Sequence, residues 1–241
     1  MKRLLVDAGN TRLKWAWADR LADSYQAQDY ARLDTLTSAA AQASEIWIAS
    51  VAGEAKEGLL VRQLTTLSGK INWVQARARE CGVINGYLRP EQLGADRWLA
   101  LIAARARSVR PTLVVSAGTA LTVDALDAEG NFLGGVIVPG MSLMRHSLAQ
   151  GTAGARGEGG SVVPFPRQTA DAVASGMWAA LAGAVRAQFE RLEAGTGGAP
   201  VCLVTGGDGE ALLLHLPLPA HYAPRLVLEG LSALAQARSE A

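Results

Sequence analysis

The sequence contains little of what several classes of protein require. Its two cysteines, Cys81 and Cys202, lie far apart and match no metal-ligand spacing, so we expect them to be reduced and buried. Basic and acidic residues nearly cancel, 23 against 22. The chain therefore lacks the broad positive field that non-specific binding to nucleic acid or to anionic membranes needs. No basic recognition helix is apparent either, so we expect neither nucleic acid nor membrane as a partner.

Long apolar runs are also missing. The stretch LGGVIVPGMSLM, residues 133–144, is broken by Gly and Pro and falls short of the roughly 20 residues of a membrane-spanning helix. The first residues reach Asp7 after three apolar positions, which leaves no signal-peptide core. These features predict a cytoplasmic protein.

The common nucleotide and hydrolase motifs are absent as well. The pair Gly69-Lys70 is followed by Ile71 and lacks the earlier glycine of a Walker A loop. No G-x-G-x-x-G opens a helix after a strand, and neither H-E-x-x-H nor G-x-S-x-G occurs. A nucleotide site, if the chain has one, must use another kind of loop.

What the chain has is 49% hydrophobic residues over 241 positions, enough for one large or two small domains. Its pattern predicts strands alternating with helices, which favours an α/β sheet. The predicted strands cover residues 3–7, 13–19, 45–53 and 71–76, then 112–119, 131–140 and 200–209. The predicted helices cover residues 58–67, 96–108, 169–193 and 229–240.

An internal repeat organises these elements. LLVDAGNTRLKWAWAD and LVVSAGTALTVDALDAEG each contain a strand, a turn of small residues and a second strand when Gly9 is aligned with Gly118. The chain therefore reads as two similar α/β halves, residues 1–110 and 111–241, that face each other across a cleft.

The two turns are suited to phosphate. Small residues between two strands leave backbone N–H groups pointing outward, where they can hold phosphate oxygens. The alternative is that Gly9 and Gly118 only permit tight hairpins, but the duplication favours the phosphate reading. Asp7 ends the first strand and suits Mg²⁺ bound through water. Asn10, Thr11 and Lys14 are candidate phosphate contacts, although Lys14 also fits a solvated strand face.

Five motifs together resemble the type III pantothenate kinases. They are DAGNTRLK (7–14), YLRPEQLGADRW (87–98), SAGTALTVD (116–124), GGVIVPGM (134–141) and QTADAVASG (168–176), in the order and spacing of that family. The resemblance implies a duplicated ribonuclease H-like fold of the actin and sugar-kinase type, with mixed sheets flanked by helices. It also implies transfer of the γ-phosphoryl group of ATP to pantothenate, the first step of coenzyme A synthesis.

The resemblance assigns roles to individual residues. Asp96 becomes the general base, with Arg97 and Tyr87 as substrate contacts. The pantothenate-binding set is Tyr87, Gly94, Ala95, Asp96, Arg97 and Thr169. The ATP-binding set is Asp7, Ala8, Gly9, Asn10, Thr11, Arg12, Leu13, Lys14, Gly118 and Thr119, and VTGGDG (204–209) is expected near the adenosine.

Each assignment has a structural alternative. Asp96 also suits the first turn of a helix, where the macrodipole favours an anion. Arg97 fits a surface position on an amphipathic helix, Tyr87 fits a partly buried aromatic, and Thr169 fits the N-cap of the long helix.

Three further expectations come with the family. Mg²⁺ is expected with ATP. A monovalent cation, K⁺ or NH₄⁺, is expected less strongly, since Ser116 stands where the family commonly has Asp, although hydroxyl and carbonyl oxygens still coordinate such ions. The family forms homodimers, with a pantothenate pocket that two subunits would share. The alternatives are a kinase for another small hydroxy acid and a non-catalytic nucleotide-binding regulator of the same fold.

Overall fold

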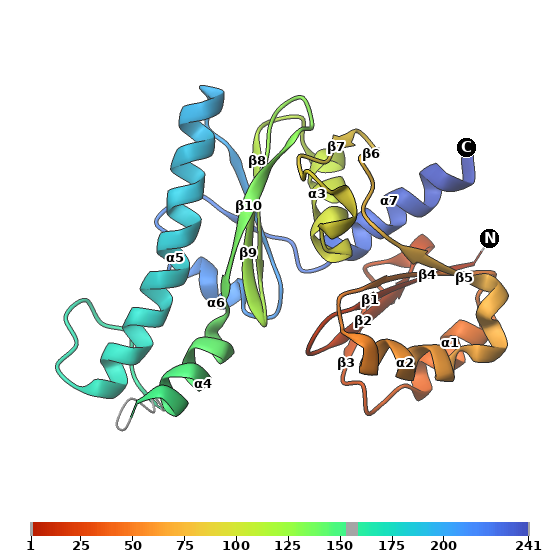
Figure 1. Ribbon diagram of the computed structural model, residues 1–241, viewed down its shortest axis with the longest axis horizontal. Helices are drawn as coiled ribbons and strands as arrows, with labels where there is room; N and C mark the ends of the chain where they lie inside the picture. Colours follow the sequence, from red (N-terminus) through yellow and green to blue (C-terminus); the bar gives the residue numbers. More distant parts are fainter. Residues whose placement is uncertain (1, 153–158, 241) are drawn as a thin grey trace. The chain divides into compact units, whose positions relative to one another are not determined.

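The computed structural model describes residues 2–152 and 159–240 (Figure 1). The chain divides into two compact units. Unit 1 comprises residues up to Arg107, the short segment Gly130–Phe132, and Arg225 onward. Unit 2 comprises Ser108–Glu129 and Leu133–Pro224. No helix in the described part of the chain is long and apolar enough to cross a membrane.

Unit 1 contains a five-stranded sheet in the order β3-β2-β1-β4-β5. The strands are β1 (Arg3–Ala8), β2 (Leu13–Trp17), β3 (Gln26–Gln28), β4 (Glu45–Ser50) and β5 (Ile71–Val74). The first three are antiparallel neighbours, whereas β4 and β5 run parallel to β1. The other elements of the unit are α1 (Asp34–Gln42), α2 (Glu54–Gln63), β6 (Arg79–Glu80), β7 (Val83–Ile84), α3 (Ala95–Arg107) and α7 (Leu226–Glu240), with short 3₁₀ turns at Ala18–Arg20, Thr65–Lys70 and Pro90–Gln92.

The two faces of this sheet are covered by different helices (Figure 1). Side chains of a strand alternate between faces. Leu4, Val6 and Ala8 pack with α1 and α2 in one apolar cluster. Leu5 and Asp7 therefore point to the other face, toward α3 and α7. Asp7 thus stands at the end of a buried strand, beneath the helix that carries Asp96.

Helix α7 belongs to unit 1, although it ends the chain. The reason is the composition of α3, which is buried on nearly all sides from Trp98 to Ala104. The sheet can cover only one side of such a helix, and α7 covers another. The two helices approach so closely that a Cβ on Gly230 would lie 1.9 Å from the carbonyl oxygen of Leu99. The repeat predicts a division between residues 110 and 111; unit 1 here extends to Arg107 and also includes residues 225–240.

Unit 2 repeats the sheet of unit 1. Its order is β10-β9-β8-β11-β12, and β8 is antiparallel to β9 and parallel to β11, as β1 is to β2 and β4. The strands are β8 (Thr112–Ala117), β9 (Ala120–Leu126), β10 (Phe132–Pro139), β11 (Val201–Thr205) and β12 (His221–Tyr222); the helices are α4 (Met141–Gly151), α5 (Thr169–Thr196) and α6 (Gly209–Leu213). The duplication read from the sequence is confirmed.

The long helix α5 covers one face of this second sheet (Figure 1). Its buried stripe contains Met177, Leu181, Val185 and Leu192, at the helical spacing seen in the sequence. These side chains pack with Leu113, Val115 and Ala117 of β8 and with Val123 of β9. Both ends of the β8–β9 turn are therefore anchored in the core of unit 2.

Candidate active site

The turn between β1 and β2 comprises Gly9, Asn10, Thr11 and Arg12, as the sequence predicts. The N–H of Gly9 donates to the carbonyl oxygen of Arg12 at 3.1 Å and closes the turn. Ala8 and Leu13, on either side of it, are fully buried. A rigid strand thus enters and leaves a short polar loop, which is the arrangement that phosphate binding by backbone amides requires.

Asp7 and Lys14 form a cross-strand pair beside this turn. They are directly opposite in the β1–β2 register, and Lys14 Nζ lies 3.3 Å from Asp7 Oδ2. Burial lowers the pKa of Lys14, but the charges of Asp7, Tyr25 and Asp96 outweigh burial, so the pKa is raised overall. Lys14 is therefore held in its protonated form, and its side chain is 24% exposed. The alternative that Lys14 lies on a solvated outer face is wrong.

Asp96 lies in the first turn of α3. Its Oδ1 accepts the backbone N–H of Arg97 at 2.8 Å, which places the carboxylate at the positive end of the helix dipole. A Cβ on Gly94 would come within 2.7 Å of the same Oδ1. Glycine at position 94 therefore leaves the room that this side-chain orientation needs. The charge of Asp96 is among the causes that raise the pKa of Lys14, beside the β1–β2 turn.

Arg97 is held among aromatic side chains, and it is only 6% exposed. Its Nη1 donates to the hydroxyl of Tyr87 at 2.7 Å. The guanidinium carbon lies 5.6 Å from the ring centre of Tyr87 and 5.9 Å from that of Phe132. Such contacts stabilise a cation out of bulk water. The structural alternative, a surface arginine on an amphipathic helix, is thus wrong.

Phe132 was not anticipated from the sequence. It is 1% exposed, and its ring centre lies 5.5 Å from that of Tyr87. It reaches unit 1 because the segment preceding β10 pairs with β7: Ile84 N–H donates to the carbonyl of Gly130 at 2.8 Å. The other unforeseen support is the buried amide of Asn85, whose Oδ1 accepts the N–H of Tyr87. Neither Phe132 nor Asn85 belongs to a periodic pattern in the sequence, so neither contact could be predicted from it.

The β8–β9 turn of unit 2 is shorter than its counterpart and comprises Gly118 and Thr119. Gly118 N–H donates to Ala120 O at 3.0 Å. Two glycines from other segments pack directly against the backbone of this turn. A Cβ on Gly140 would lie 2.0 Å from Gly118 O, and one on Gly206 would lie 2.1 Å from Ala117 O, so neither position has room for a side chain. The VTGGDG segment therefore lies against this turn, and Thr119 O accepts the N–H of Gly140.

Ser116 lies one position before Ala117 and pairs with Thr122 across the strands. Thr122 Oγ1 is buried and has no hydrogen-bond partner among the described residues. No cluster of three or more His, Cys, Asp or Glu side chains occurs in the described part of the chain. Any bound cation here must therefore take ligands from hydroxyls, carbonyls, single carboxylates, water or phosphate.

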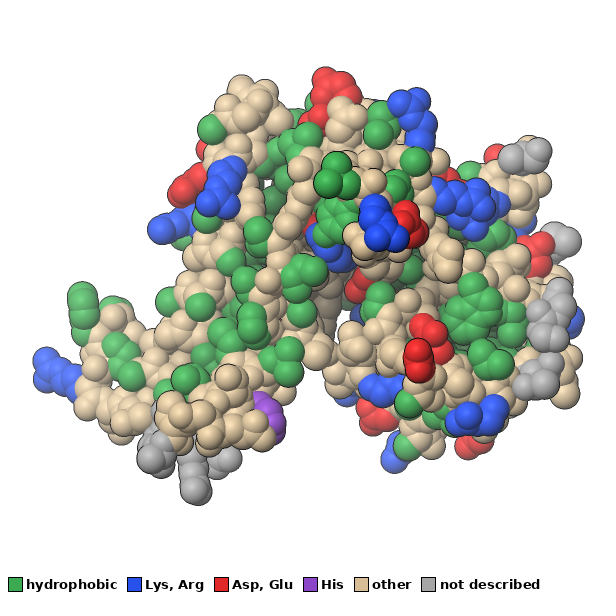
Figure 2. Space-filling view, viewed as in Figure 1, with side chains coloured by type: hydrophobic (Ala, Val, Ile, Leu, Met, Phe, Trp, Pro, Cys, Tyr) green, Lys and Arg blue, Asp and Glu red, His purple; other side chains and the backbone are tan. Residues whose placement is uncertain are grey.

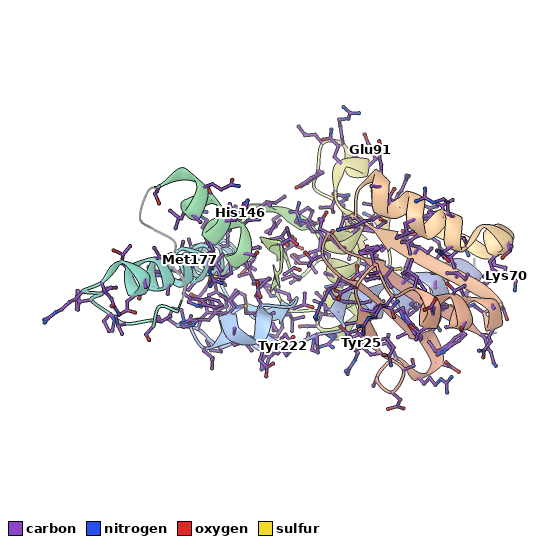
Figure 3. The ribbon with its side chains drawn as sticks, turned by 90° about the horizontal axis from the view of Figure 1, so that it is seen from below. Tyr25, Lys70, Glu91, His146, Met177 and Tyr222 are labelled. Atoms are coloured by element: carbon purple, nitrogen blue, oxygen red, sulfur yellow. The ribbon has the colours of Figure 1, made fainter. Side chains whose placement is uncertain are left out.

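Thr169 lies on a groove of unit 2 of about 1140 Å³. The groove runs between α4 and the start of α5, where His146 and Met177 lie close together (Figure 3), and hydrophobic side chains gather over this region in Figure 2. Thr169 is the first residue of α5, and Gln168 occupies the N-cap position without a side-chain capping bond. The expected N-cap role of Thr169 is therefore wrong by one position.

Of the residues expected at the site, unit 1 brings together Asp7, Lys14, Asp96 and Arg97 with Tyr87. Gly118, Thr119 and Thr169 belong to unit 2. Both cysteines are free; Cys202 is buried and Cys81 is half-buried.

Comparison with known proteins decides the family. The sequence profile of type III pantothenate kinases matches residues 3–191. The chain belongs to the type III pantothenate kinase family. A type III pantothenate kinase from Thiobacillus denitrificans is 49% identical over 241 residues, with 98% of this chain and 97% of the relative covered. The family resemblance drawn from the five motifs is confirmed.

Solved structures show the same fold. A conserved Baf family protein from Campylobacter jejuni, described as a transcriptional activator, has a TM-score of 0.65 at 20% identity, with 99% of this chain and all of that chain covered. The activator of 2-hydroxyisocaproyl-CoA dehydratase from Clostridium difficile, with bound ADPNP, has a TM-score of 0.56 at 10% identity, with 100% and 95% covered. At these identities the likeness shows the fold alone. The expected α/β fold of the actin and sugar-kinase type is confirmed.

Proposed function

We propose that this chain transfers the γ-phosphoryl group of ATP to pantothenate, the reaction for which its family is named, and that Asp96 is the general base. The observation that carries the proposal is the placement of Asp96 in unit 1. It lies in the first turn of α3 next to Arg97, whose guanidinium contacts Tyr87, and its charge helps to raise the pKa of Lys14 beside the β1–β2 turn. A carboxylate between an acid-binding cation and a phosphate-binding cation suits a substrate that has both an alcohol and a carboxylate.

Asp96 acts on the substrate alcohol. Its carboxylate accepts the proton as the alcohol oxygen attacks the phosphorus, which is the role an aspartate plays in kinases. The positive end of α3 and the bond from Arg97 N–H favour the ionised carboxylate. Gly94 and Ala95 contribute backbone at the same helix terminus.

Arg97 and Tyr87 bind the substrate carboxylate. A guanidinium binds both oxygens of a carboxylate at once, and the ring contacts of Arg97 hold its plane in one orientation. Thr169 supplies a further contact at the start of α5, where exposed N–H groups favour an anion.

The two turns hold the phosphates of ATP. Residues 7–14 contribute the first turn and the Lys14 cation, and Gly118 with Thr119 contributes the second. Mg²⁺ fits this arrangement, because it is commonly bound through one or two carboxylates together with water and phosphate oxygens. Asp7, a buried carboxylate beside the first turn, would hold it through water, and Mg²⁺ would neutralise charge on the phosphates.

Three finer proposals follow the family. The chain forms a homodimer; the apolar groove at Thr169 supports this, because such a surface is favourable to bury. K⁺ or NH₄⁺ binds weakly near Ser116, because a neutral hydroxyl replaces a full charge. The enzyme works in the cytoplasm, where its substrate ATP is abundant.

A coupled assay for ADP release tests the proposal. Pantothenate is expected to stimulate ADP release, whereas pantothenol, which has an alcohol in place of the carboxylate, is expected to do so only at far higher concentration. A panel of other hydroxy acids tests the rival kinase activities. ATP binding with no ADP release for any acceptor would contradict the proposal and support a regulator without turnover.

A further inference from the structure

Two side chains outside every phosphate motif hold carbonyl oxygens of the β1–β2 turn. The hydroxyl of Tyr30 donates to the carbonyl oxygen of Gly9 at 2.8 Å. The ammonium of Lys56 donates to the carbonyl oxygen of the next residue, Asn10. Tyr30 follows β3 and Lys56 lies on α2, so two separate elements converge on one turn.

These two side chains also contact each other. Lys56 Nζ lies 5.1 Å from the centre of the Tyr30 ring, at a distance typical of a cation over an aromatic face. Tyr30 in turn packs against the apolar cluster of unit 1. Burial raises the pKa of Tyr30, and the charges of Asp7 and Glu57 raise it further, so the hydroxyl keeps the proton that it donates.

The direction of the carbonyls fixes the direction of the amides. In a planar trans peptide, the C=O of one residue and the N–H of the next point to opposite sides. The C=O of Gly9 points to Tyr30, so the N–H of Asn10 points away from it. By the same rule, the N–H of Thr11 points away from Lys56. Glycine has no Cβ to restrict its peptide planes, and the two donors restrain this orientation in addition to the Gly9 N–H bond that closes the turn.

We propose that Tyr30 and Lys56 are positioning residues that lock two peptide planes of the β1–β2 turn, so that the N–H groups of Asn10 and Thr11 face the phosphate chain of a nucleoside triphosphate. The inference rests on the proposed function in one respect, that the ligand of this turn is the phosphate chain of ATP. It predicts that the contribution of Tyr30 and Lys56 is specific to phosphates and is absent for a nucleoside.

Binding measurements on Tyr30→Phe test this directly, because the variant removes one hydroxyl and no charge. Calorimetry should show ATP affinity weakened about three- to tenfold, the range expected for one hydrogen bond, with adenosine affinity unchanged. Lys56→Met should weaken the affinity for ATP and leave that for adenosine unchanged. Lys56→Arg should restore most of the ATP affinity, since arginine keeps both the charge and the donor.

Lys70→Met is the matched control. Lys70 also donates to a backbone carbonyl, that of Ala43 at 3.1 Å. It lies beside the N-terminal ends of β4 and β5, whereas the β1–β2 turn follows the C-terminal end of β1, to which β4 runs parallel. Figure 3 shows Lys70 well apart from Tyr25, which precedes β3. This variant should bind ATP and adenosine as the wild type does, even where its thermal midpoint falls.

Two results would overturn the inference: Tyr30→Phe binding ATP as tightly as the wild type, or ATP and adenosine affinity falling by the same factor. The second would mean that Tyr30 only stabilises unit 1. The readout is independent of turnover. If wild-type protein binds ATP but pantothenate stimulates no ADP release, the proposed function fails while the inference stands. If the wild type turns over pantothenate and Tyr30→Phe binds ATP as tightly as the wild type does, only the inference fails.

Discussion

Arg97 donates a 2.7 Å hydrogen bond to the hydroxyl of Tyr87 and stacks over the same ring. Arg97 is 6% exposed and its guanidinium is held in place by this bond, so it can meet an anionic ligand without first being ordered. Replacement of Arg97 by Lys keeps the charge but loses the planar, two-pronged donor.

Arg97→Lys should therefore raise the KM for pantothenate about tenfold or more, the range for a hydrogen bond to a charged group. The KM for ATP should change little. Steady-state kinetics with each substrate varied in turn checks this, with pantothenol as the second acceptor. The variant should lose most of the preference for pantothenate over pantothenol; an unchanged preference would show that Arg97 does not bind the carboxylate.

Phe132 is the second aromatic contact of Arg97, with its ring centre 5.9 Å from the guanidinium carbon. Phe132→Leu keeps an apolar side chain but removes the ring face, so we expect a higher KM for pantothenate and an unchanged KM for ATP. The neighbouring Leu133 is 57% exposed, and Leu133→Ala should change neither KM and alter the free energy of unfolding by no more than about 0.5 kcal/mol. Equal increases in both KM values for Phe132→Leu would indicate a general loss of stability instead.

Gly94 leaves room for the Asp96 carboxylate, because a Cβ there would lie 2.7 Å from Oδ1. Gly94→Ala should therefore displace the carboxylate and lower kcat while ATP affinity persists. Gly58→Ala on α2 is the control, since its Cβ would meet the Arg62 side chain at an ordinary 3.5 Å. That change should stabilise the protein by about 0.4–1 kcal/mol and leave kcat alone. Normal kcat in Gly94→Ala would show that the position of Asp96 is not critical.

Lys14 gives a pH dependence of known sign. Burial lowers its pKa from 10.5, but Asp7, Tyr25 and Asp96 outweigh burial and raise it. The folded protein thus holds this proton more tightly than the unfolded chain, so the stabilisation is complete below pH 10.5 and is lost as the pH rises through the folded pKa.

Denaturant unfolding of wild type and Lys14→Met over a pH series measures this contribution. The difference in free energy of unfolding between them should stay constant from about pH 8 to pH 9.5 and shrink at higher pH. Lys70→Met corrects for the general effect of losing a lysine. A difference that grows with pH would mean that the charged form of Lys14 is not favoured by folding.

Much of the fold was predictable because its signals are local. The hairpin around Gly9 recurs around Gly118, and the duplicated sheet order follows from that repeat. The stripe from Met177 to Leu192 defines the buried face of α5. The placement of α7 was not predictable, because apolar spacing shows that a helix is buried but not which sheet or helix covers it.

The candidate site was predictable only where the residues form motifs. Asp7, Asp96 and Arg97 lie in recognisable segments, and unit 1 brings them together. Phe132 and Tyr30 act through long-range contacts: Phe132 contacts Arg97, and Tyr30 holds the carbonyl of Gly9. Such contacts depend on how loops return to the sheet, which periodicity and composition do not encode.

The most direct test of the account is pantothenate-dependent ADP release by Asp96→Asn. Asparagine keeps the oxygen that accepts the Arg97 N–H, so the helix terminus should stay intact. We expect kcat to fall about 10²- to 10⁴-fold, the range for loss of a general base, while ATP binding persists. Asp34→Asn, in the first turn of α1, should behave as the wild type does. ADP release by Asp96→Asn at the wild-type rate would contradict the central claim.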